Sequence, residues 1–436
     1  MSSQLAPTSR QHVLVIEPAT PGPLTPFANM LTSAGYDVVI LSGALRDPAL
    51  LPKGARFLGF RDRPAEQAAG LDPVLGHVEI ALQRAQVIAQ VARTLLAASW
   101  VPDLILGLGD GTTHLLGDVF PAARTIVHVD RYLPAGTDGI FETGTGARVE
   151  ARLHRRVDNV VGLLAAVHAD WSVCPLPSAR ASFPAYLHPR MSVTPPAVDI
   201  EFFSLSPSSA PMPGVGRESP AVVVHGRTAD PASTTWAVVL EIARVAPLAQ
   251  ITVVTPDSGE VPESVGAAVL VEVRPTPAKR RSLARSATVV LCTDSADVWP
   301  VPLVEALACG AIVVAAITPT TSALIEHGTS GYLVEGSDPT AHAHAAGWVL
   351  ANLATQDNLR SAGRASAVRF GLAQTTETYQ RLVAWVLAGG AGPIRPHPFR
   401  PHPFRPLAVA AVDPSPVGAI DEQITDTYHE AVSAAG

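Results

Sequence analysis

The stretch that decides the fold is PVPLVEALACGAIVVAAITPTTSALIEHGTSGYLVEG, at residues 300–336. Pro302 suits the first turn of a helix, because the N–H that proline lacks would have no partner there. Gly310 suits the end of that helix, because glycine takes a left-handed conformation without strain. The apolar run from Ile312 then predicts a buried strand, followed by a turn-rich loop, a second short helix and a second strand.

One carboxylate in this stretch, that of Glu305, is predicted to lie in the first turn of the first helix. A carboxylate held there can accept hydrogen bonds from two neighbouring sugar hydroxyls. The helix start, which comprises Pro302, Leu303 and Val304, offers free amides that can hold a phosphate. The alternative is a surface glutamate that the helix dipole favours by ~0.3–1 kcal/mol. The combination predicts a seat for a nucleotide sugar.

The same stretch resembles the donor-site segment of the retaining glycosyltransferase family that includes the bacterial group-1 sugar transferases. Members of that family carry an acidic residue, seven intervening residues, Glu-Ala-Met-Ala-Cys-Gly, a buried strand and Glu-His-Gly-x-x-Gly-x-Leu-Val. The residues that match here are EALACG at 305–310, IVV at 312–314, EHG at 326–328 and GYLV at 331–334. Segments 102–121 and 171–199 resemble the acceptor side and the crossover of the same family.

Length and composition exclude several classes of protein. A chain of 436 residues predicts two domains. The net charge of −7, without a basic stripe, argues against nucleic acid as a partner. Polar residues 1–10 lead us to expect no signal peptide, and no apolar run approaches the ~20 residues of a membrane span. Three scattered cysteines indicate reduced, buried thiols, so we expect a cytoplasmic protein without a transmembrane segment.

Strands and helices alternate along the chain, which indicates α/β architecture. His12–Glu17 and Tyr36–Leu41 are predicted strands around a helix at Phe27–Ala34, and 77–98 has helical spacing. The resemblance implies a GT-B-like fold, with two Rossmann-like doubly wound parallel-sheet domains facing a central cleft. The other predicted strands are Asp103–Leu106, Thr125–Val129, Ala221–Val224, Gln250–Val254, Val269–Val273, Thr288–Leu291 and Ile312–Ala315.

Composition and resemblance together divide the chain into six segments. Two tandem RPHPF repeats lie at 395–404, and a Pro-rich segment of this kind could dock a partner protein. Residues 359–388 are predicted to be a long amphipathic helical region. The expected organisation is a flexible N-terminus at 1–10, an acceptor-side Rossmann-like domain at 11–200, a linker at 201–220, a donor nucleotide-sugar-binding domain at 221–370, a C-terminal helix at 371–388 that returns to the N-terminal domain, and a Pro-rich, disordered tail at 389–436.

The phosphate-binding residues implied by the resemblance are Gly226 and Arg227, after the first strand of the second domain. An arginine suits a diphosphate because its guanidinium pairs with phosphate oxygens through two hydrogen bonds. The family has a second basic residue five or six positions later, where this chain has Ala232 and Ser233. The chain therefore diverges from the family at the donor phosphate site. The alternative for Arg227 is a loop charge in water.

Asp297 lies eight residues before Glu305, where the family usually has a glutamate that contacts the transferred sugar. Aspartate keeps the charge but is one methylene shorter, and it is also a common turn or N-cap residue. Val298-Trp299-Pro300 stands where many members have Gly-Phe-Gly. Pro300 has no N–H to donate to a phosphate.

His128 ends a predicted strand, at about the position where family members place a histidine near the sugar. It could hydrogen-bond a donor hydroxyl or the developing charge, or it could be a satisfied buried histidine at a strand end. Asp110, Asp130 and Asp138 lie on turn-like segments that face the same predicted cleft. Any of the three could orient an acceptor hydroxyl.

The leading hypothesis is therefore an enzyme that moves a sugar from a nucleotide-diphosphate donor to the hydroxyl of a glycan, lipid or protein acceptor, with retention. We expect no cofactor and no metal, because neither an Asp-x-Asp motif nor a cysteine pair with ligand spacing occurs. The divergent donor residues leave a second hypothesis open. In it, a catalytically degenerate GT-B protein binds or scaffolds another transferase. A nucleotide-sugar epimerase of similar architecture is a third.

Overall fold

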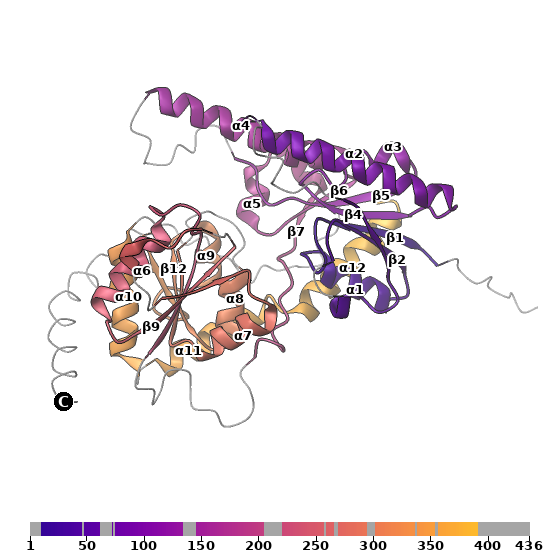
Figure 1. The fold of residues 1–436 in the computed structure, drawn as a ribbon. Coiled ribbons are helices and arrows are strands. Elements are labelled where there is room, and N and C mark those ends of the chain that lie inside the picture. The colour runs from indigo at the N-terminus through magenta and orange to yellow at the C-terminus, as the bar shows by residue number, and fades with distance from the viewer. Residues whose placement is uncertain are drawn as a thin grey trace, which may run out of the picture. The chain divides into compact units, whose positions relative to one another are not determined.

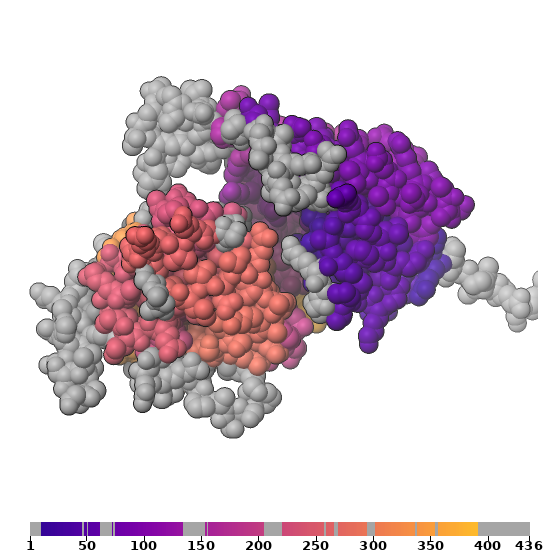
Figure 2. Space-filling model, in the orientation of Figure 1, coloured from indigo at the N-terminus to yellow at the C-terminus, as the bar shows by residue number. Residues whose placement is uncertain are grey.

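The computed structural model describes residues 10–45, 48–61, 72, 75–133, 145–204, 220–256, 259–265, 269–293, 301–335, 338–353 and 356–390. The chain divides into two compact units (Figure 1). Unit 1 takes the chain up to Ala197 and resumes at Leu372, and unit 2 takes Val198–Gly371. In the space-filling view, indigo to purple atoms make up most of unit 1, and pink to orange atoms most of unit 2 (Figure 2). Asp138, Asp297, Pro300 and the repeats at 395–404 lie outside the described residues.

The sheet of unit 1 is wholly parallel in the described residues, with strand order β3-β2-β1-β4-β5-β6-β7. Its central strands are near-continuous apolar runs, as strands covered on both faces must be. Short 3-10 turns lie at Pro48–Leu50 and Ala185–Arg190. The strands are β1 His12–Glu17, β2 Asp37–Ser42, β3 Arg56–Gly59, β4 Leu104–Leu108, β5 Arg124–His128, β6 Trp171–Cys174 and β7 Met191–Val193.

Helices cover both faces of this sheet. Val13 and Val15 of β1 pack with α1 and α12 in one core, and Leu14 and Ile16 pack with α2 and α3 in another. In Figure 1, the yellow helix α12 therefore belongs with the indigo helix α1, although the whole of unit 2 separates them in sequence. The helices of unit 1 are α1 Thr25–Ser33, α2 Gly76–Ala97, α3 Leu116–Val119, α4 Thr145–His168, α5 Pro177–Ser182 and α12 Leu372–Leu387.

Unit 2 repeats the strand order of the first six strands of unit 1. Its described sheet is parallel throughout, in the order β10-β9-β8-β11-β12-β13. The order is that of a doubly wound Rossmann-like sheet, so the predicted fold class is confirmed for both domains. The strands are β8 Ala221–His225, β9 Gln250–Thr255, β10 Leu270–Val273, β11 Val289–Cys292, β12 Ile312–Ala316 and β13 Tyr332–Val334.

The two faces of this sheet also carry different helices. Val222 and Val224 of β8 pack with α6 and α10, whereas Val223 packs with α7, α8 and α11. A 3-10 turn lies at Glu263–Val265. The helices of unit 2 are α6 Thr234–Val245, α7 Pro277–Ser286, α8 Val301–Ala308, α9 Pro319–Leu324, α10 Pro339–Ala351 and α11 Asp357–Val368.

The helical region predicted at 359–388 consists of two helices, α11 and α12, with a break between Val368 and Leu372. At the break, the carbonyl of Phe370 accepts a hydrogen bond from the backbone N–H of Val198 at 3.1 Å. Gly371 also packs tightly against Ile200 and leaves little room for a side chain. The chain therefore leaves unit 2 beside the point where it entered.

Two expectations from composition concern the described residues directly. Cys174, Cys292 and Cys309 are buried and not joined in disulfides, as predicted. In the described part of the chain, every helix is too short or too polar to span a membrane.

Candidate functional site

The carboxyl ends of β8 and β11 form the point in unit 2 where the sheet reverses its winding. The two strands are neighbours. The helix after β8, α6, covers one face, and α8 after β11 covers the other. Ligands of doubly wound sheets bind outside the strand ends at such a point. We therefore take the residues around this edge of unit 2 as the candidate site.

Gly226 allows α6 and the end of β11 to pack closely at this edge. The backbone N–H of Thr293 donates to the carbonyl of His225 at 3.0 Å, and the hydroxyls of Thr235 and Thr293 lie 2.9 Å apart. A Cβ atom on Gly226 would lie well inside van der Waals contact with both hydroxyl oxygens. Only glycine lets the first turn of α6 meet the end of β11 here. This gives Gly226 a packing role beside its predicted phosphate contact.

Helix α8 confirms part of the opening sequence pattern and corrects another part. It ends at Ala308, and Gly310, whose φ is +77°, turns the chain away; the N–H of Ala311 donates to the carbonyl of Ala306 at 3.0 Å. Pro302 is its second described residue. Glu305 is the fifth, so the prediction that Glu305 lies in the first turn is wrong. With 3.6 residues per turn, its carboxylate sits beyond the free amides of the helix start.

The carboxylate of Glu305 instead meets a guanidinium. Arg280 on α7 donates from Nε to Oε2 and from Nη2 to Oε1 of Glu305, both at 2.8 Å. Its Nη1 donates to the carbonyl of Pro275 at 3.1 Å. The Glu305 side chain is only 4% exposed, and that of Arg280 is 27% exposed. A carboxylate so deeply buried requires a partner of this kind, because burying an unpaired charge is very costly.

Arg280 also lies close enough to the end of β8 to influence His225. Burial and the positive charge of Arg280 lower the pKa of His225 to about 4. His225 is therefore neutral at pH 7. Three elements, β8, α7 and α8, thus bring an ion pair and a neutral imidazole to one edge of the sheet.

Arg280 was not among the residues predicted from the sequence. A signal was present, because Lys279, Arg280 and Arg281 stand in the N-terminal half of a helix capped by Thr276. The helix dipole disfavours positive charge there, so a cation in that position calls for a nearby carboxylate.

The other predicted residues of the site are placed as follows. Arg227 follows Gly226 and is exposed. The side chains of Leu303 and Val304 are fully buried in the core of unit 2, so these two residues can offer a ligand only their backbone. Pro302 is half-buried and has no N–H. Asp297 lies outside the described residues.

His128 occupies a different environment, in unit 1. Its Nε2 lies 2.8 Å from the hydroxyl oxygen of Tyr379 on α12, and its ring lies 5.3 Å from that of Phe27 on α1. Side chains alternate along a strand, and Ile126, two residues earlier, belongs to the same core as these helices. His128 therefore points into the α1 and α12 layer, which favours the interpretation as a satisfied core histidine. Burial lowers its pKa to about 3.

Asp110 and Asp130, which were predicted to orient an acceptor, also have charged neighbours. Arg84 on α2 donates from Nη1 to Oδ2 of Asp110 at 3.0 Å and to its carbonyl at the same distance. Burial raises the pKa of Asp110, and the guanidinium opposes that shift. Burial also raises the pKa of Asp130, and the negative charge of nearby Asp110 raises it further.

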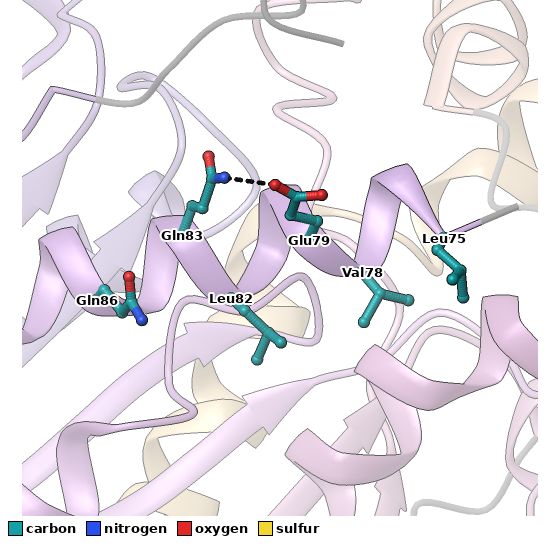
Figure 3. A pocket seen from close by; sticks show the side chains of 6 residues that line it. All are labelled: Leu75, Val78, Glu79, Leu82, Gln83 and Gln86. Carbon is teal, nitrogen blue, oxygen red and sulfur yellow. Dashed lines mark hydrogen bonds between the residues drawn. The ribbon is translucent and has the colours of Figure 1, made fainter. Parts of the chain in front are cut away.

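Two other features of the structure bear on possible sites. Within the described residues, no group of three or more histidine, cysteine, aspartate or glutamate side chains could hold a metal ion. An open hollow of about 420 Å³ lies along α2 in unit 1 (Figure 3). One helix alone lines it, and its one carboxylate, Glu79, accepts a hydrogen bond from Gln83 at 2.9 Å. None of the predicted residues lines this hollow.

Two segments of the chain match known family models. Residues 35–203 match the family model described as glycosyl transferase family 4 group, and residues 274–366 match glycosyl transferases group 1. A stretch of 108 residues is 32% identical to D-inositol 3-phosphate glycosyltransferase 1 from Catenulispora acidiphila. That match covers 25% of this chain and 26% of the relative, so it spans about a quarter of either protein.

Solved structures share the fold. Sucrose-phosphate synthase from Thermosynechococcus elongatus has a TM-score of 0.66 at 16% identity, over 87% of this chain and 100% of that one. HepE from Anabaena, in complex with UDP-glucose, has a TM-score of 0.62 at 16% identity, over 86% of this chain and 100% of that one. The chain thus has the GT-B fold and two glycosyltransferase-type domains. The two model matches support the expected assignment to the group-1 glycosyltransferases.

The tight packing at Gly226 gives a first prediction. We expect Gly226→Ala to lower the free energy of unfolding by about 2 kcal/mol, because an added methyl must displace Thr235 or Thr293. Gly347→Ala is the matched control in the same unit. A Cβ there meets its nearest atom, in Val245, at an ordinary 3.7 Å, and alanine is the better helix former. Equal unfolding midpoints in urea for the two variants would contradict the packing role.

The position of His128 beneath α1 and α12 gives a second prediction, on pH. Its unfolded form binds a proton near pH 6.5, whereas the folded form does so only near pH 3, so acid favours unfolding. Between pH 7.5 and 5, the wild type should lose about 1–2 kcal/mol more of its unfolding free energy than His128→Gln. Urea titrations at both pH values measure this difference. Parallel losses in the two proteins would show that His128 titrates normally.

Proposed function

We propose that this protein is a glycosyltransferase that moves a sugar from a nucleoside-diphosphate donor to an acceptor hydroxyl, with retention of the anomeric configuration. The observation that carries the proposal is the buried Glu305 carboxylate, held by Arg280 at the strand edge of unit 2. This carboxylate lies inside the segment that matches the group-1 glycosyltransferase model. HepE, which shares the fold, is recorded in complex with UDP-glucose, which supports a donor of that class.

Each part of the donor has a proposed partner. The Glu305 carboxylate accepts hydrogen bonds from the ribose hydroxyls. Arg227 and the backbone amides of Leu303 and Val304 bind the diphosphate, since first-turn amides of a helix lack partners within it. Asp297 contacts the transferred sugar. The contact between His128 and Tyr379 supports the packing of α12 in unit 1.

The same groups account for the chemistry. When the bond between the sugar C1 and the phosphate oxygen breaks, the diphosphate leaves with the electron pair. Arg227 and the helix amides stabilise that negative charge. The acceptor oxygen bonds to C1 on the face that the phosphate leaves, and the acceptor proton passes to the leaving phosphate oxygen. The residues named here supply the charge stabilisation without a metal ion.

Acceptor and location are proposed more broadly. The acceptor is a hydroxyl of a glycan, lipid or protein, oriented by Asp110 or Asp130 in unit 1. The inositol 3-phosphate in the name of the Catenulispora relative is that protein's own, because the match covers only 26% of it. We place the protein in the cytoplasm, where its three free thiols stay reduced.

A second function is favoured by one observation. Ala232 and Ser233 occupy the second basic position, so the diphosphate has one cation fewer than the resemblance implies. A degenerate GT-B protein that scaffolds an active transferase, bound through the Pro-rich tail, would tolerate that loss. Turnover by the isolated chain eliminates this candidate.

The donor proposal is tested by calorimetric titration of UDP, GDP and ADP into wild type, Glu305→Ala and Glu241→Ala. We expect one nucleotide to bind, and Glu305→Ala to weaken it at least tenfold, since hydrogen bonds to a charged group are worth about 1.5–3 kcal/mol. Glu241, on the surface of α6, pairs with Arg244 and serves as the control. No binding of any of the three to the wild type at millimolar concentration would refute the donor proposal.

A further inference from the structure

We infer that Arg280 is a positioning residue that presents the Glu305 carboxylate to the donor ribose and thereby sets the preference of the site for ribonucleotides. This inference rests on the proposed function, because it assumes a nucleoside diphosphate at the edge of unit 2. It adds a residue that neither the motif nor the resemblance indicated. Arg280 lies 25 positions before Glu305, on a different helix.

Three hydrogen bonds fix the guanidinium in place. Nε and Nη2 face the two oxygens of Glu305, and Nη1 binds the carbonyl of Pro275, which precedes α7. The planar guanidinium is therefore tied both to α8 and to the turn before α7. A group held on two sides has few orientations left to lose when a ligand binds, which is the advantage of preorganisation.

The bidentate pair leaves acceptor capacity on the carboxylate. An ionised carboxylate offers about four lone-pair sites, and Arg280 uses two of them. One site per oxygen remains, which matches the two adjacent hydroxyls of a ribose. Because Arg280 fixes the plane of the carboxylate, it also fixes the direction of these two remaining sites.

The chemistry of the pair requires arginine in particular. Two parallel N–H groups match the two oxygens of a carboxylate, whereas a lysine ammonium is a compact charge on a flexible stem. Lysine would keep the charge near Glu305 but would let the carboxylate rotate. Substitution by lysine therefore separates orientation from charge.

The position of Arg280 supports a role in the site over a role in helix stability. It is the fourth residue of α7, in the half of the helix where the dipole disfavours a cation. Its guanidinium donates to the carbonyl of Pro275, two residues after the end of β10, which places it near the carboxyl edge of the sheet. In the proposed function, Glu305 contacts the ribose, and Arg227, just after β8, contacts the diphosphate.

The test compares ribose with deoxyribose. Kd is measured by calorimetry for UDP, GDP and ADP and for their 2′-deoxy and 3′-deoxy forms, in wild type, Arg280→Lys, Arg280→Gln, Glu305→Gln and Arg281→Gln. In the wild type, we expect the ribonucleotide that binds to do so on the order of tenfold more tightly than its deoxy forms. This ratio should approach one in Arg280→Gln and Glu305→Gln and be intermediate in Arg280→Lys. The deoxy affinities should change little.

Arg281→Gln is the matched control, because the guanidinium of Arg281 stacks on Phe202, 4.0 Å from the ring centroid, and donates to the Phe202 carbonyl instead of to Glu305. It should keep the wild-type ratio. A wild-type ratio in both Arg280 variants overturns the inference. An equal loss of ribonucleotide and deoxynucleotide affinity in these variants also overturns it, because it indicates a purely structural role. Tighter binding in these variants overturns it as well, because it shows that Arg280 competes with the ligand for Glu305. If the wild type binds no nucleotide, the proposed function itself fails.

Discussion

The constraint on which the structure depends is the parallel pairing of fully buried central strands. Parallel neighbours need a crossover between them, and the order β3-β2-β1-β4 in unit 1 recurs as β10-β9-β8-β11 in unit 2. Helices must then leave β8 and β11 for opposite faces, which opens the sheet edge between them. The close approach at Gly226 and the ion pair of Glu305 with Arg280 both lie along that edge. The winding of the sheet determines where chemistry can occur, and local packing determines which groups are presented there.

The sequence predicted those parts of the fold whose burial is uniform. β1 was predicted to the residue, because Val13–Ile16 are buried on both faces and stand out as an apolar run. Helix α4 was not predicted. The helix is amphipathic, with Val161 and Ala165 buried and Leu153, Val160 and Val167 exposed, so its pattern was available in the sequence and was overlooked. β3 is short and half-exposed, and its four residues carry no such run.

The residues of the candidate site that belong to local sequence motifs were predicted. The contact that depends on packing between two helices was not. Glu305, Gly226 and Gly310 sit in local patterns that a sequence displays. The partner of Glu305 does not, because the pairing with Arg280 arises only when α7 packs against α8. His128 shows the reverse case. Its place in the sequence suggested a ligand contact, but strand alternation directs it to Tyr379, 251 positions away.

The break at Phe370 and Gly371 has a consequence for how the protein is made. Helix α12 belongs to unit 1 but follows unit 2 in the sequence. The ribosome therefore begins unit 1 first but completes it only after it has synthesised Val198–Gly371 of unit 2. While unit 2 is being synthesised, the layer of unit 1 that receives Tyr379 and Val383 stays uncovered, and its apolar surface faces solvent or a chaperone. The described part of unit 2 comes from one continuous run of sequence, Val198–Gly371. Of the two units, the one encoded first is therefore the more vulnerable to truncation near the carboxyl terminus.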